Sequence, residues 1–399
     1  MSTGGFSPAR LARVRRLLDR HVGTGLVPGL VVALARHGEV HVEAVGNLAF
    51  DGAGSTTPFA GDTIVRMASM TKPIVAACAM TLVEEGTLRL DDPVDDLLPE
   101  LAGMRVLADP YGPVEDTVPA EQPITLRHLL TFTFGTGMAI AEPGTVPIAD
   151  ALDAVGEPEP DEWIRRLGTL PLLHQPGERW VYETAADVTG VLIARATGKS
   201  FETAVRERVC EPLGLKDTGF RVSADRLDRF APAYANENAP TGEPVVQDGR
   251  DGCWSRPPVF IGGGGGLVST ADDYLTFGSA LLAGGAHRGT RMLSRPAVTL
   301  MTTDHLTPAQ KAVSRLSGFA PDYFDTLGWG FGLSVRTRRT QLGPSVGSYG
   351  WSGLYGTAWY NDPAEDLAAV VVMQRGHLGD QTLPMWADLW TAVYQAIDD

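Results

Sequence analysis

A serine and a lysine three residues apart, Ser69 and Lys72, stand directly before a long apolar run, and this arrangement constrains the chain more than any other feature. Residues 73–83 are apolar on nearly every face, which is typical of a helix buried inside a domain. Residues three apart on a helix lie side by side, so the hydroxyl and the amine are expected to meet. Because Pro73 is tolerated only near a helix start, Ser69 is expected at the helix N-terminus, where free N–H groups favour a developing oxyanion.

This pair of side chains predicts nucleophilic catalysis. A serine hydroxyl becomes a good nucleophile only when a neighbouring group accepts its proton, and lysine can do so when its amine is neutral. Burial in so apolar a helix is expected to lower the pKa of Lys72. With four lysines and sixteen serines, however, a Ser-x-x-Lys motif arises by chance in roughly one of six such sequences, so a solvated lysine in the first turn of a core helix is the alternative.

Composition narrows the class of protein. The chain has 399 residues, 44% of them hydrophobic and 20% charged, which is typical of a globular enzyme of one large or two smaller domains. A net charge of −15 argues against nucleic acids and anionic membranes as partners. Three scattered cysteines, no signal peptide and no apolar run long enough to span a membrane predict a cytoplasmic protein without disulfides. The sequence does not indicate an oligomeric state.

The order of the patterns predicts an antiparallel sheet built from both ends of the chain, with a helical insertion between. The strands are expected at 30–36, 40–45, 329–335, 357–361 and 367–374, and the helices at 124–130, 161–167, 185–197 and 383–397. An Arg-rich amphipathic segment after Ser7 is expected to form a surface helix beside the last one, a transit sequence being the alternative. We therefore expect an α/β subdomain of residues 1–66 and 264–399, a mainly helical subdomain of residues 67–263, and the active site between them.

Several further motifs follow in order along most of the chain. They are Met67-Ala68-Ser69-Met70-Thr71-Lys72-Pro73, Leu88-Arg89-Leu90-Asp91-Asp92-Pro93-Val94, Ile124-Thr125-Leu126-Arg127-His128-Leu129-Leu130-Thr131, Pro176-Gly177, Tyr182, Gly263-Gly264-Gly265-Gly266-Leu267-Val268-Ser269-Thr270 and Gly350-Trp351-Ser352-Gly353. In these motifs the chain resembles the serine β-lactamase and penicillin-binding-protein superfamily, in particular class C β-lactamases and family VIII carboxylesterases. The resemblance implies a β-lactamase-like fold that needs no cofactor.

The second catalytic motif of that superfamily is Tyr-x-Asn, and the matching segment here begins at Tyr182. The tyrosine is retained, whereas Thr184 replaces the asparagine. A phenol held against Lys72 and Ser69 can relay a proton between the nucleophile and the leaving group. Tyr182 is therefore predicted to be catalytic, the alternative being a core tyrosine at a strand-to-helix junction.

The third motif is Lys-Thr-Gly, and here Trp351-Ser352-Gly353 takes its place. In β-lactam enzymes a cation at this point attracts the substrate carboxylate, which tryptophan cannot do. Family VIII esterases are similar in carrying Trp, so we expect these three residues to bind uncharged esters. The resemblance also implies an oxyanion hole formed by the backbone N–H groups of Ser69 and Leu354. The alternative for Trp351 is a packed core aromatic.

A rival nucleophile is Ser345, which lies in a G-x-S-x-G motif and is followed by Asp362, Asp366 and His377 in the order of an α/β-hydrolase. Such a serine must lie between a strand and a helix, and no helix follows Ser345, so this assignment is disfavoured. The glycine run 262–266 is expected to be a turn leading to a helix capped at Ser269 or Thr270. The histidines and cysteines show no metal-binding spacing, so no metal site is implied.

Together these observations predict a serine hydrolase with an acyl-Ser69 intermediate, most simply a carboxylesterase acting on small neutral esters. Three alternatives remain. One is a β-lactamase, D,D-peptidase or D-amino-acid amidase. Another is an acyltransferase or peptide-cyclising thioesterase, in which a different nucleophile replaces water. The last is a catalytically silent binding protein of the same fold. The expected partner in all the enzymatic cases is a small ester or acyl substrate.

Overall fold

The centre of the molecule is a seven-stranded antiparallel sheet with the strand order β11-β12-β13-β14-β15-β1-β2. A computed structural model describes residues 4–138, 144–236, 243–314, 322–376 and 382–399. The strands of the sheet are β1 Gly29–Arg36, β2 Glu39–Gly46, β11 Leu327–Trp329, β12 Ser334–Arg336, β13 Tyr349–Gly353, β14 Thr357–Asp362 and β15 Leu367–Val372. The predicted sheet from both ends of the chain is therefore confirmed.

Two pairings determine how the sheet is assembled. In the β1–β2 hairpin Arg36 pairs with Glu39, and the two turn residues His37 and Gly38 have φ values of 50° and 78°. Both therefore lie in the left-handed region, as a tight hairpin turn that matches strand twist requires. In the β1–β15 pair Val32 lies opposite Val371, so the first strand joins the last one inside the sheet, and β2 forms the edge beyond β1.

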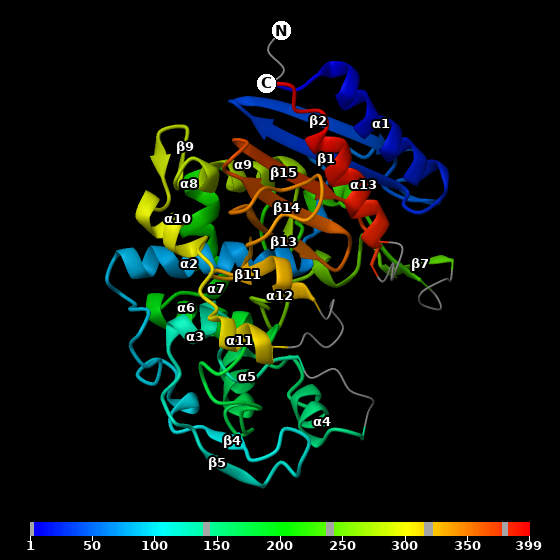
Figure 1. Cartoon of the computed structure of the whole chain (residues 1–399). Helices are drawn as coiled ribbons and strands as arrows, with labels where there is room; N and C mark the ends of the chain where they lie inside the picture. Colours follow the sequence, from blue (N-terminus) through cyan, green and yellow to red (C-terminus); the bar gives the residue numbers. More distant parts are fainter. Residues whose placement is uncertain (1–3, 139–143, 237–242, 315–321, 377–381) are drawn as a thin grey trace.

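Helices α1 (Pro8–Gly23) and α13 (Thr382–Tyr394) lie side by side on one face of the sheet, as Figure 1 shows. Apolar residues of both helices and of β1 and β15 form one hydrophobic cluster there. A bridge between Phe6 and Ile397 holds the two ends of the chain together beside them. The expected packing of the first and last helices is confirmed.

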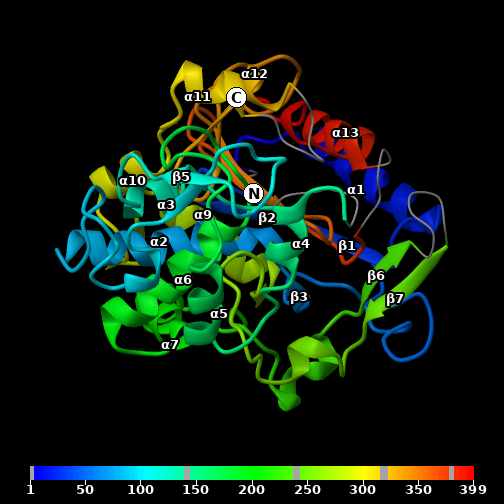
Figure 2. The same cartoon turned by 90° about the horizontal axis from the view of Figure 1, so that it is seen from below.

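The opposite face of the sheet packs against α9 (Ala271–Leu282), and the larger hydrophobic cluster extends from there through α2 (Thr71–Glu84) to α6 (Thr184–Thr197). Figure 2 shows α2, α6 and α7 grouped together, and the β6–β7 hairpin projecting on the other side. The other helices are α3 Leu126–Leu130, α4 Pro147–Asp153, α5 Pro160–Leu167, α7 Phe201–Val205, α8 Glu211–Leu213, α10 Arg295–Met301, α11 Pro308–Val313 and α12 Tyr323–Thr326.

Four two-stranded ribbons accompany the central sheet. They are β3 Val65–Arg66 with β8 Val268–Ser269, β4 Arg105–Leu107 with β5 Thr117–Pro119, β6 Ala233–Asn236 with β7 Pro244–Asp248, and β9 Ala286–His287 with β10 Thr290–Arg291. Within the described ranges, no helix is both long enough and apolar enough to cross a membrane.

The predicted single strand 329–335 is wrong, because two strands occupy it. Gly332 adopts φ 67° between β11 and β12, and a Cβ atom there would lie 2.9 Å from the Lys72 carbonyl oxygen. The chain turns at this glycine because only glycine can approach α2 so closely in that conformation. The expected order of an antiparallel sheet from both ends of the chain with helices between is present, whereas the two-subdomain division stays a prediction.

Candidate active site

Ser69 lies in a short 3-10 turn, η1 (Ala68–Met70), that leads directly into α2. Ala68 has φ 46°, a left-handed conformation that alanine rarely adopts. Thr71 stabilises it, because its hydroxyl donates to the Ala68 carbonyl (2.7 Å) and accepts from the Leu267 N–H (3.0 Å). Ser69 is partly exposed at this turn, so its hydroxyl is accessible from outside.

Lys72 is the buried centre of the site. Lys72 is 1% exposed. Its Nζ donates to Ser69 Oγ at 3.1 Å, to Glu183 Oε1 at 2.9 Å and to the Gly264 carbonyl at 2.6 Å. The predicted meeting of Ser69 and Lys72 is therefore present in the structure. The contact with Glu183 was not predicted from the sequence.

The charge state of Lys72 differs from the sequence-based expectation. Burial by itself lowers the pKa of Lys72, but the charge of the Glu183 carboxylate, with the hydrogen bond to Tyr182, outweighs it, and the net pKa is raised above the ordinary value. The expectation of a neutral amine is therefore wrong. Lys72 is an ammonium ion at neutral pH because the Glu183 carboxylate accepts a hydrogen bond from its buried Nζ.

Tyr182 lies against both members of the pair. Its ring centroid is 4.5 Å from Lys72 Nζ, and its hydroxyl accepts a hydrogen bond of 2.9 Å from Trp351 Nε1. Burial raises the pKa of Tyr182, while the Lys72 charge and hydrogen bonds with Ser69 and Lys72 act in the opposite direction. The phenol is therefore protonated at neutral pH and surrounded by groups that stabilise its anion.

The third predicted motif lies on β13. Trp351 is buried, with its ring edge-on to Trp329 at 4.6 Å between centroids, whereas Ser352 is exposed. Gly353 lies directly on the Ser69 turn, since a Cβ atom there would be 2.2 Å from the Met67 carbonyl oxygen. The residue after it, Leu354, is 51% exposed and follows the strand at this point. The end of β13 is thus adjacent to η1, as the predicted oxyanion hole requires.

The segment after Tyr182 differs in detail from the expected pattern. Thr184 begins α6, and the contact with Lys72 comes from Glu183, which has φ 92°. The glycine run also contributes, because Gly264 presents its carbonyl to Lys72 and its N–H to Asp187 Oδ1 at 2.8 Å. The expected helix cap after this run is confirmed at Thr270, which accepts from Asp273 N. The sequence signal that could have identified Glu183 is its place directly after Tyr182, inside the second motif.

A cavity of about 850 Å³ opens beside these residues, and Glu183, Thr184 and Gly265 are part of its wall. Its aromatic lining residues are Trp163, Phe220, Trp254 and Phe260, and its acidic ones are Asp153, Glu157, Glu183 and Asp187. No lysine or arginine is among the lining residues that the structure describes. Burial and the nearby Glu183 raise the pKa of Asp187 to about 7. The wall therefore combines aromatic rings with carboxyl groups, and Trp351 is not part of it.

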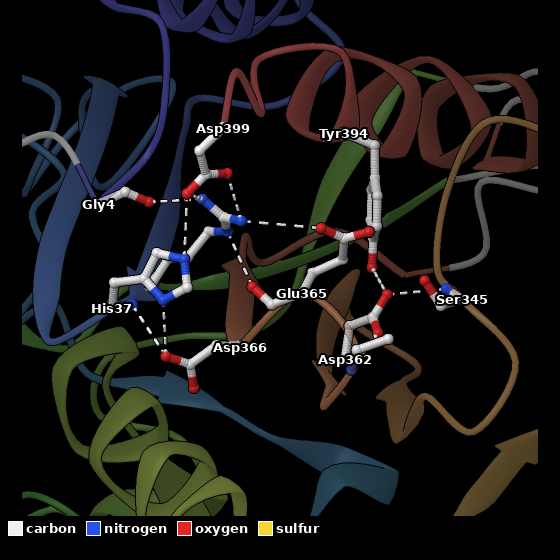
Figure 3. A network of polar contacts seen from close by, with 10 residues as sticks. Gly4, His37, Ser345, Asp362, Glu365, Asp366, Tyr394 and Asp399 are labelled. Carbon is white, nitrogen blue, oxygen red and sulfur yellow. Dashed lines mark hydrogen bonds and ion pairs between the residues drawn. The ribbon is translucent and has the colours of Figure 1, made fainter.

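Figure 3 shows the residues around Ser345, the rival nucleophile. The carboxylate of Asp362 accepts from the backbone N–H of Ser345 at 2.8 Å and from the Tyr394 hydroxyl at 2.7 Å. Asp366 instead contacts His37 Nδ1 at 3.0 Å. His377 lies outside the described residues. Asp362 therefore fixes the backbone of the Ser345 loop against α13, and α13 is not the helix that a nucleophile elbow requires.

The site brings together an accessible hydroxyl on a strained turn, an amine and a phenol. Within the described ranges no group of His, Cys, Asp and Glu side chains is arranged to hold a metal ion. The beta-lactamase family matches residues 14–390, and the chain belongs to this family.

Individual relatives agree with this assignment. Protein Rv1367c of Mycobacterium tuberculosis is 39% identical, over 91% of this chain and 88% of its own length. Esterase EstB of Burkholderia gladioli is 32% identical, over 96% and 95%. The solved structure of EstCE1, described as a hydrolase with promiscuous acyltransferase activity, has a TM-score of 0.78 at 26% identity, over 97% and 99%. With the family, these relatives identify the chain as a serine hydrolase.

Proposed function

We propose that the protein is a carboxylesterase in which Ser69 is acylated and Lys72 and Tyr182 move the proton. The observation that carries the proposal is the position of Lys72 Nζ, 3.1 Å from Ser69 Oγ and 4.5 Å from the centroid of the Tyr182 ring. EstB and EstCE1 are described as an esterase and a hydrolase, which supports ester hydrolysis for this chain.

The chemical step follows from the charge states. As Ser69 Oγ attacks the ester carbonyl, Tyr182 gives its proton to the departing alkoxide, Lys72 gives one to the Tyr182 oxygen, and the Lys72 amine so formed accepts the Ser69 proton. This relay leaves Lys72 charged before and after the step. The backbone N–H groups of Ser69 and Leu354 hold the oxyanion, and water then hydrolyses the acyl-Ser69 ester by the reverse relay.

The cavity wall favours neutral over anionic substrates. Aromatic rings offer apolar contact to an acyl or alcohol group, and the carboxyl groups Glu183 and Asp187 repel a substrate carboxylate. A β-lactam carries such a carboxylate. Trp351 in place of a lysine supplies no cation to compensate. The contact of the substrate with Trp351, Ser352 and Gly353 remains a prediction.

A second candidate is acyl transfer to an alcohol or amine. The acyltransferase activity described for EstCE1 favours it, because the same acyl-serine can be resolved by any nucleophile that reaches it. Water and acceptor would compete for one intermediate.

We also propose a cytoplasmic location, because Cys78 and Cys210 are buried as free thiols, which is typical of a reducing compartment.

One panel of substrates tests these alternatives. It comprises p-nitrophenyl esters of increasing chain length, a chromogenic cephalosporin and a D-alanyl anilide, each measured with and without an added primary alcohol. We expect short neutral esters to have the highest kcat/KM and Ser69→Ala to abolish turnover. A cephalosporin kcat/KM equal to that of the best ester would refute the esterase assignment. An alcohol that diverts most of the acyl group would establish transferase activity instead.

A further inference from the structure

Glu183 has an unusual relation to Lys72. Its Oε1 accepts from Lys72 Nζ at 2.9 Å, although its own side chain is 28% exposed and forms part of the cavity wall. The carboxylate thus reaches inward from the cavity to an ammonium group whose side chain is fully buried. An isolated buried charge is unfavourable, so an ion pair at this position has a large effect on the charge of the lysine.

The backbone at Glu183 is held in a conformation that the contact requires. Its φ of 92° and ψ of −80° are rarely adopted by residues with a side chain, and such outliers persist where the surroundings impose them. The segment that faces Glu183 is the glycine run, which has no side chains at this point. A Cβ atom on Gly264 would lie 2.5 Å from Glu183 Oε1, and one on Gly263 would lie 2.2 Å from the Ala186 carbonyl oxygen. Two glycines therefore make room for the carboxylate and for the start of α6.

Other groups around Lys72 do not duplicate this contact. Asp187, one turn further along α6, uses Oδ1 to accept from Gly264 N, and Tyr182 presents its ring to Lys72 Nζ. Ser69 on η1 and the Gly264 carbonyl are uncharged. Of the described carboxyl groups, Glu183 is the one in direct hydrogen-bond contact with Lys72.

We propose that Glu183 is a positioning residue that keeps Lys72 as an ammonium ion directed at Ser69 Oγ, and that it thereby sets the pH range in which Ser69 is acylated. The inference rests on the proposed catalytic role of Ser69 and Lys72. Without the carboxylate, only Tyr182 opposes the effect of burial, so the pKa of Lys72 should fall below that of the wild type. The same carboxylate also raises the pKa of Tyr182, so its removal shifts both groups in the same direction.

Direct observation of the lysine is the first test. The chain has four lysines, Lys72, Lys199, Lys216 and Lys311, so protein labelled with ¹³C at lysine Cε gives few signals, and a Lys72→Arg variant assigns one of them. We expect the wild-type Lys72 signal to stay at its ammonium position through pH 9. In Glu183→Gln its midpoint should fall below that of the wild type by about 1 to 3 pH units, the range typical of losing a close opposite charge. A neutral Lys72 in the wild type at pH 8, or an unchanged midpoint, would overturn the proposal.

The second test measures acylation of Ser69 without assuming the natural substrate. The rate of labelling by a fluorophosphonate is followed against pH in the wild type, Glu183→Gln, Glu183→Asp and Glu157→Gln. Glu157 lies on the same cavity wall without contacting Lys72, which makes it the matched control. The descending limb of the rate–pH curve, in which Lys72 loses its proton, should move to lower pH in Glu183→Gln only, with Glu183→Asp closer to wild type. A limb that moves equally in Glu157→Gln would refute a specific role for Glu183.

The two tests separate the possible failures. If the probe fails to label Ser69 in the wild type, the proposed function fails, and the lysine titration still decides whether Glu183 controls the charge of Lys72. If Ser69 is labelled but neither the titration nor the limb moves, Glu183 is a structural residue of the cavity wall and the inference is refuted.

Discussion

The hydrogen bond from Trp351 to Tyr182 supports a quantitative prediction about catalysis. Trp351→Phe keeps an aromatic ring against Trp329 but removes the N–H that lies 2.9 Å from the Tyr182 hydroxyl. In the relay this oxygen gains negative charge, and a hydrogen bond to a charged group contributes about 1.5 to 3 kcal/mol. Since about 1.4 kcal/mol corresponds to tenfold in rate, kcat should fall by about 10- to 150-fold.

A matched substitution separates this effect from lost packing. Trp359 lies opposite Trp351 on the neighbouring strand, is fully buried, and donates its Nε1–H to Asn361 Oδ1 at 2.9 Å. Trp359→Phe should therefore lower the melting temperature at least as much as Trp351→Phe while changing kcat less than threefold. Both variants would be assayed with the best p-nitrophenyl ester and by thermal unfolding. A Trp351→Phe enzyme within threefold of wild-type kcat would show that the indole N–H does not assist Tyr182.

Three further outcomes follow from the site. A fluorophosphonate should modify the peptide containing Ser69, and Ser345→Ala should keep wild-type activity; label on the Ser345 peptide would contradict this. Lys72→Ala and Tyr182→Phe should each lower kcat by about 10² to 10⁴-fold, the range typical of general acid–base groups, and a loss of only a few-fold would indicate a structural residue. Because the Asp187 pKa is raised to about 7, the stability that its protonated form provides is lost as pH rises through 7. Asp187→Asn should therefore gain more stability over the wild type at pH 8.5 than at pH 5, and an equal difference in urea unfolding at both pH values would refute this.

The parts of the site that could be predicted are those fixed by local sequence. Ser69 and Lys72 meet because one helical turn brings them together, and Tyr182 was identified from its place in the order of motifs. These relations depend on chain order and helix geometry, which a sequence displays. The pairing of the first and last strands could be predicted in the same way, since two β-branched runs stand at the ends of the chain.

The remainder depends on backbone conformations that a pattern of residue types does not display. Glu183 reaches Lys72 only because its φ is reversed to 92°, and a helical residue at that position would point elsewhere. The raised Lys72 pKa could not be predicted because burial alone gives the opposite sign. The hairpin at Gly332 was missed for a similar reason, since its apolar sequence is typical of one continuous strand.

The pairing of β1 with β15 has a consequence for how the protein is made. During synthesis β1 and β2 leave the ribosome long before β15, so the hydrogen-bonding edge of β1 that β15 later covers has no partner. Exposed edges of apolar strands associate readily with other chains, and pairing between distant segments is slow to form. The helical segment between them can collapse around its own apolar residues first. The interval before the last strand arrives is therefore the period in which the nascent chain is most exposed to aggregation and most dependent on chaperones.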